Sequence, residues 1–190
     1  DVSCLTHVEK LDITYPVDNS FAKLHNLKEL KIICNGTEKY LKDLENLSSL
    51  RSLECYSTRD VASIVENLTQ LTELNINGFP VNNPTYNLRA LRNLTSLKLR
   101  YAFVDLPTTL PYLVNLKHLS VEGLSIIGVE TCTNLQSLTV ERKSGAFEDL
   151  INLTSLNIKY ELEDITLTKL TNITSLSFMS APNLSDVGLS

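Results

Sequence analysis

The sequence lacks the features of several protein classes. No apolar run is long enough to cross a bilayer, and no block of lysine or arginine suggests binding to anionic lipid. Acidic residues outnumber basic ones by 22 to 17, whereas a non-specific nucleic-acid binder needs a basic surface. We therefore expect neither membrane insertion in this segment nor a nucleic-acid partner.

Candidate catalytic and cofactor sites are also scarce. The three histidines, His7, His25 and His118, form no HxxxH-type pair and have no cysteine or serine partner at a telling distance. There is no glycine-rich phosphate loop, and the four cysteines lack the CxxC pairs of a zinc site. The sequence therefore predicts no catalytic residues, no metal, no cofactor and no enzymatic activity.

What the chain does contain is a repeat. The pattern apolar-x-x-apolar-x-x-apolar-x-apolar occurs nine times, as in Leu68-Leu71-Leu74-Ile76, and every key position is apolar. Successive units are 18 to 23 residues apart. The end of each unit, such as residues 73–77, alternates polar and apolar residues, which predicts a short strand with one buried face. One unit cannot bury its apolar face alone, so we expect stacked units.

Segments such as LTELNI, LTSLKL, LKHLSV and LTSLNI resemble the strand signature of leucine-rich-repeat proteins over nearly the whole chain. The short, irregular units are most similar to bacterial and protist surface or effector repeats. The resemblance implies an α/β solenoid, a right-handed superhelix with a parallel β-sheet on its concave face. Short helical, 3₁₀ or irregular segments would lie on the convex side, with residues 59–67 the best candidate for a helical turn. We expect one domain of about nine repeats over residues 1–190, either complete or part of a longer protein.

One column departs from the family pattern. Many members place Asn or Cys three residues after the last strand position, where the side chain satisfies the turning backbone. Only Asn35 fits this position here. We therefore expect the usual asparagine ladder to be missing and the turns to be satisfied in another way.

The outward strand residues predict the binding surface. They form three columns on the concave face, and a Tyr/Arg-bearing edge lies beside the third column. Tyrosine and arginine are enriched at interface hot spots; the alternative is a solvated sheet face. The candidate partner-binding residues are Tyr56, Asn75, Asn77, Lys98, Arg100, Tyr101, His118, Glu122, Glu141, Arg142, Lys159 and Tyr160.

Two observations on cellular location conflict. Cys55 and Cys132 occupy key apolar positions, and free buried thiols favour a reducing compartment. A disulfide between Cys34 and Cys55 would need a register shift and is not expected. N-x-S/T acceptors for N-glycosylation occur at Asn35, Asn46, Asn67, Asn93, Asn152, Asn172 and Asn183, mostly as by-products of the repeat. The location stays open, with a lean towards a secreted or cell-surface protein.

Three functions remain open at this stage. The first is a protein-binding module that uses the concave face. The second is a structural or adhesive surface array that binds glycan or matrix. The third is the sensing or regulatory part of a larger, receptor-like protein. The sequence favours a protein partner and gives no indication of the oligomeric state.

Overall fold

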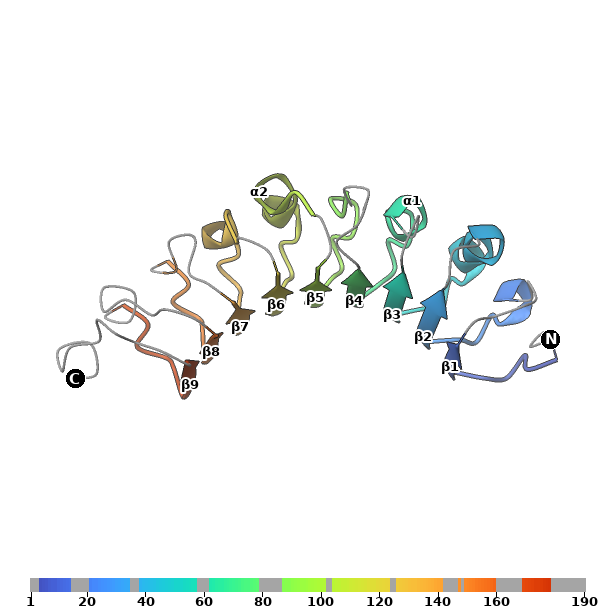
Figure 1. Ribbon diagram of the computed structural model, residues 1–190, viewed down its shortest axis with the longest axis horizontal. Coiled ribbons are helices and arrows are strands. Elements are labelled where there is room, and N and C mark those ends of the chain that lie inside the picture. Colours follow the sequence, from blue (N-terminus) through green and yellow to red (C-terminus); the bar gives the residue numbers. More distant parts are fainter. Residues whose placement is uncertain are drawn as a thin grey trace.

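The computed structural model describes residues 4–14, 21–34, 38–57, 62–78, 87–101, 104–123, 126–141, 147, 149–159 and 169–178. These residues form an arc of coils, each with one strand on the inner side of the arc and an irregular or helical segment on the outer side (Figure 1). The nine parallel strands pair in sequence order into one sheet, from β1 at one end to β9 at the other. The predicted solenoid with a concave parallel sheet is confirmed.

All nine strands are short. Their bounds are β1 Lys10–Thr14, β2 Glu29–Cys34, β3 Ser52–Ser57, β4 Glu73–Gly78, β5 Ser96–Arg100, β6 His118–Glu122, β7 Ser137–Val140, β8 Ser155–Ile158 and β9 Ser175–Phe178. Each strand pairs with the next so that equivalent key residues lie side by side, as Leu74 does with Leu97. The predicted register therefore holds through the whole sheet.

Within the described residues, the convex side carries six helical segments of three to nine residues. These are the 3₁₀ helices η1 (Phe21–Lys23), η2 (Glu38–Asn46), η3 (Leu110–Tyr112) and η4 (Val129–Thr131), with the α-helical turns α1 (Ala62–Val65) and α2 (Leu106–Thr109). The expected helical turn within residues 59–67 is found as α1. Pro107 lies in the first turn of α2 and Pro111 lies within η3, positions that keep both segments short.

The core runs along the inside of the coils. In the seven inner coils all four key residues are buried, from Leu24 in the second coil to Ile158 in the eighth. A second buried row, which includes Phe21, Leu44 and Phe147, lies in the convex segments. The two end coils are less covered, since Leu5 is 40% exposed and Phe178 is 36% exposed. Neighbour stacking therefore buries the apolar face that one coil alone leaves in water.

Candidate functional site

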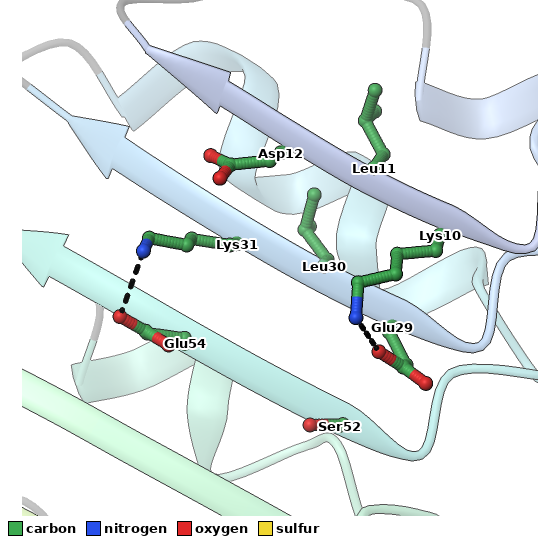
Figure 2. Close-up of a pocket in the computed structure, with 8 residues that line it drawn as sticks. All are labelled: Lys10, Leu11, Asp12, Glu29, Leu30, Lys31, Ser52 and Glu54. Atoms are coloured by element: carbon green, nitrogen blue, oxygen red, sulfur yellow. Dashed lines mark ion pairs between the residues drawn. The ribbon is translucent and has the colours of Figure 1, made fainter.

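In the first half of the concave face, two lysines each pair with a glutamate of the neighbouring strand. Lys10 Nζ lies 2.7 Å from a Glu29 carboxylate oxygen, and Lys31 Nζ lies 3.4 Å from one of Glu54. These side chains, with Asp12 and Ser52, line an open trough of about 310 Å³ over strands β1 to β3 (Figure 2). The ion pair between Lys10 and Glu29 is highly exposed, and exposed pairs contribute little to stability.

Tyr56 belongs to this first cluster. The Lys31 ammonium lies 5.7 Å from the centre of the Tyr56 ring, within cation–π range. Burial alone would raise the pKa of Glu54. Hydrogen bonds from Tyr56, Lys31 and Asn75, with the Lys31 charge, hold that pKa below its ordinary value. Asn75 is thereby fixed beside Glu54, while its own Oδ1 is buried without a hydrogen-bond partner among the described residues.

A second cluster lies where strands β5 to β8 end, and we call it the strand-end edge: Arg100, Tyr101, Glu122, Gly123 and Lys159. Arg100 Nε and Nη2 donate to the two carboxylate oxygens of Glu122 at 2.8 and 3.2 Å, a bidentate pair. Lys159, which follows β8, reaches the same carboxylate at 3.3 Å. The Glu122 side chain is only 13% exposed. Two cations therefore fix one largely buried carboxylate.

The electrostatics of Glu122 follow from these contacts. Hydrogen bonds from Arg100 lower the pKa of Glu122, and burial opposes this shift. With the added contribution of Lys159, the pKa stays below its ordinary value. The same bonds raise the pKa of Arg100 above its ordinary value. Both groups therefore stay charged across the physiological pH range, and the geometry of the pair is retained.

Tyr101 adopts an unusual backbone conformation beside this pair. Its φ is 52°, the one positive φ of a non-glycine residue in the described part of the chain. Its backbone N–H donates to the Glu122 carbonyl at 3.0 Å. Gly123, at φ 79°, lies under the ring, and a Cβ there would be 2.4 Å from Tyr101 Cδ1. Left-handed backbone costs a non-glycine residue roughly 1–3 kcal/mol and is concentrated at ligand clamps and active sites.

The strained residue remains accessible. The Tyr101 side chain is 46% exposed, although its ring covers Gly123. A glycine is required at position 123 both for the positive φ and for the close approach of the ring. The fold therefore displays a large aromatic surface in a fixed orientation next to a fixed ion pair.

The structure brings together only part of the predicted binding set. Arg100, Tyr101, Glu122 and Lys159 form one cluster, whereas Tyr56 and Asn75 join the cluster around Glu54. Asn77, Lys98, His118 and Glu141 lie on or next to the outward face of the sheet, with no side-chain partner among the described residues. Arg142 and Tyr160 lie outside the described residues. Gly123 was not among the predicted residues, although it directly follows Glu122, which pairs in register with Arg100.

The column three residues after each strand lies outside the described residues, so the expectation that asparagine is missing there stays a prediction. A different ladder is present at the rim where the strands begin, in the position before the second key residue of a unit. Side-chain Nδ2 atoms there donate to a backbone carbonyl of the preceding coil, from Asn26, Asn93, Asn115, Asn134, Asn152 and Asn172, at 2.7 to 2.9 Å. Gln70 makes a similar bond at 3.0 Å. These bonds link successive coils along the rim where the strands begin.

The ladder gives several N-x-S/T asparagines a structural role. Asn93, Asn152 and Asn172 use their Nδ2 atoms as ladder donors. Asn67 Nδ2 donates to Glu45 at 2.9 Å, whereas Asn46 is exposed at the end of η2. Asn35 and Asn183 lie outside the described residues. Glycosylation of any of these positions stays a prediction.

Other candidate sites are few in the described part of the chain. No group of three or more His, Cys, Asp or Glu residues in that part could hold a metal ion. None of the helices described there has both the length and the apolar character of a membrane span. Cys55 and Cys132 are buried, as predicted, and burial raises the pKa of the Cys132 thiol to about 11. The Cys34 side chain is not among those described.

Comparison with solved structures gives the fold. The chain matches an internalin of Listeria monocytogenes with a TM-score of 0.74 and 23% identity, over 100% of this chain and 61% of that one. A leucine-rich-repeat protein of Leptospira interrogans matches with a TM-score of 0.68 and 18% identity, over 99% and 59%. The chain has the leucine-rich-repeat fold. A TDR receptor matches with a TM-score of 0.63 and 16% identity, over 95% of this chain and 36% of that one.

The limits of this similarity are also clear. No protein-family model and no curated protein sequence matches the chain. The chain spans about three-fifths of the length of the first two solved proteins, 61% and 59%. At these identities the likeness establishes the solenoid architecture, and function must be argued from the surface of this chain.

Proposed function

We propose that residues 1–190 act as one protein-binding domain whose strand-end edge is the centre of the contact with a protein partner. The observation that supports this most directly is Tyr101, an exposed aromatic residue held in left-handed backbone over Gly123. Strain of this kind has a stability cost, and it persists where the surroundings enforce a particular side-chain position. A fixed tyrosine loses little conformational entropy when a partner covers it.

The neighbouring charges favour the same function. Arg100 and Lys159 are both engaged with Glu122, so a partner meets side chains that are already ordered. Tyrosine and arginine are the residue types over-represented among interface residues that carry most of the binding free energy. The largely buried Glu122 also keeps the Arg100 guanidinium in one plane, which suits directed hydrogen bonds to a partner. The strand-end edge thus combines apolar area with oriented donors.

The alternative function of catalysis has little support in these residues. The histidines His7, His25 and His118 are all exposed, and each lies on a different coil. On the concave face Glu29, Glu54 and Glu122 are paired with lysine or arginine rather than placed around a reacting group. We propose that the chain binds a partner and does not transform it.

Site-specific photo-crosslinking tests this proposal. A photoreactive phenylalanine analogue replaces Tyr101 in one sample and Tyr112 in another, because Tyr112 is a similarly exposed tyrosine (42%) on the convex turn η3. We expect a protein adduct at position 101 and none at position 112. With the adduct partner purified, Arg100→Ala should weaken the affinity by roughly thirtyfold, the loss of about 2 kcal/mol that defines a hot spot. Equal labelling at both positions would refute the proposal.

A further inference from the structure

A second surface lies on the strand-start rim, away from the strand-end edge. Six side chains of the sixth to eighth coils line a groove of about 450 Å³ there: Asn115, Lys117, Asn134, Gln136, Asn152 and Thr154. This volume is within the range of small-molecule and oligosaccharide-sized sites. Five of the six side chains are uncharged and polar, and none is a carboxylate or an aromatic ring. The groove therefore differs in chemistry from the charged concave face.

The asparagine amides of the groove are held in fixed orientations. Asn115, Asn134 and Asn152 each donate Nδ2 to a carbonyl of the preceding coil at 2.9 Å. Their Oδ1 atoms have no hydrogen-bond partner among the described residues. The ladder thus presents a row of acceptors, one per coil, whose ordering cost has already been met by the fold.

The adjoining side chains add both donors and acceptors. Neither the Gln136 amide nor the Lys117 ammonium has a side-chain partner among the described residues, and both side chains are exposed. Directly before two of the ladder asparagines in sequence, Val114 and Ile151 are 59% and 57% exposed. A sugar can use hydrogen-bond donors, acceptors and exposed apolar side chains together. Its hydroxyls both donate and accept, and its C–H faces pack on apolar surface.

We propose that this rim groove is a binding site for a neutral oligosaccharide chain that lies across the sixth to eighth coils. Neighbouring coils are about 5 Å apart at the sheet, close to the length of one sugar ring in an extended chain. An extended peptide fits less well, because its side chains repeat on one face roughly every 7 Å.

Other ligand classes lack their usual contacts in the groove. A phosphate group would call for arginines or several cations, and Lys117 is the one cation among the lining residues. A metal ion would call for carboxylates, and the lining contains none. The site is independent of the strand-end edge, so the oligosaccharide and protein proposals can fail separately.

Titration with two defined sugars tests the site. Chitohexaose and cellohexaose are added separately to the ¹⁵N-labelled chain, and the side-chain amide signals of Asn115, Asn134, Asn152 and Gln136 are followed by NMR. We expect at least one of the two sugars to shift these signals saturably while the signals of Arg100 and Tyr101 stay in place. If neither sugar shifts the groove amides, or if the shifts map to the concave face, the proposal is overturned.

A pair of variants provides the affinity test. Lys117→Ala/Gln136→Ala removes two side chains that make no hydrogen bond within the described structure, so the fold should be retained. We expect the affinity for the responding sugar to fall by about five- to fiftyfold, the loss of two modest hydrogen bonds. The matched control is Lys98→Ala/Ser120→Ala on the outward face of β5 and β6. This double variant should change the affinity for the sugar less than about twofold. Equal effects of the two double variants would overturn the proposal.

Discussion

Removing a single rung of the asparagine ladder should measurably weaken the solenoid. In Asn134→Ser the short hydroxyl cannot reach the Val114 carbonyl, which now accepts a bond from Asn134 Nδ2 at 2.9 Å. The reciprocal change is Ser49→Asn. Ser49 occupies the ladder position of the third coil, and an asparagine there would face the His25 carbonyl of the preceding coil, by analogy with the other rungs.

The expected loss of unfolding free energy follows from the exposure of the Asn134 side chain. Asn134 is exposed, so water can replace part of the lost bond, and the net loss should be about 1 kcal/mol. For a chain of this length, 1 kcal/mol corresponds to roughly 2–4 °C in the melting temperature. Ser49→Asn should raise stability by a similar or smaller amount, because the new side chain loses some rotamer freedom.

Urea unfolding followed by circular dichroism provides the assay. Asn157→Ser is the matched control, since Asn157 points outward from β8 and has no side-chain hydrogen bond among the described residues. We expect the unfolding midpoint to fall for Asn134→Ser, to stay within error for Asn157→Ser and to rise for Ser49→Asn. If Asn134→Ser and Asn157→Ser agree within about 0.3 kcal/mol, the ladder does not stabilise the fold as argued.

Two further predictions concern titratable groups. Because the folded pKa of Glu122 is lowered, its ion pairs stabilise the fold above the unfolded carboxyl pKa of about 4.3, and this stability is lost as the pH falls through the folded value. Glu122→Gln should therefore lower the melting temperature at pH 7 more than at pH 3, and an equal change at both would contradict the assignment. Since burial raises the pKa of Cys132 to about 11, a thiol reagent at pH 8 should label exposed Cys4 and leave Cys132 unlabelled until urea is added. Peptide mapping by mass spectrometry checks this, and rapid native labelling of Cys132 would show that the thiol is accessible.

The asparagine ladder illustrates how a pattern can be visible in the sequence while its structural role is not. Asparagine precedes the second key residue in six of the nine units, so this column can be recognised from the sequence. From the sequence alone this column accounts for several of the N-x-S/T motifs and has no predicted hydrogen-bond partner. The structure shows that each Nδ2 atom in this column lies within reach of a carbonyl of the preceding coil, as in Asn93 to Thr69. Sequence spacing alone does not give that distance.

The sequence by itself determined the repeat, the strand register and the residues that face the core. Four apolar positions recur in each coil, and residues of a strand alternate between its two faces, so stacking the coils leaves one buried set. Leu74, Leu97 and Leu119 therefore lie side by side in the structure, as the pattern required.

Only the tertiary structure decided which outward side chains of different coils meet. Lys159 passes the intervening strand β7 to reach Glu122, and Tyr101 adopts left-handed backbone over Gly123. Both outcomes depend on side-chain reach, on the local path of the chain after each strand and on the space left by a neighbouring coil. The repeat period predicts which face of the sheet a residue occupies. Contacts between side chains of different coils depend on three-dimensional distances, which the period does not predict.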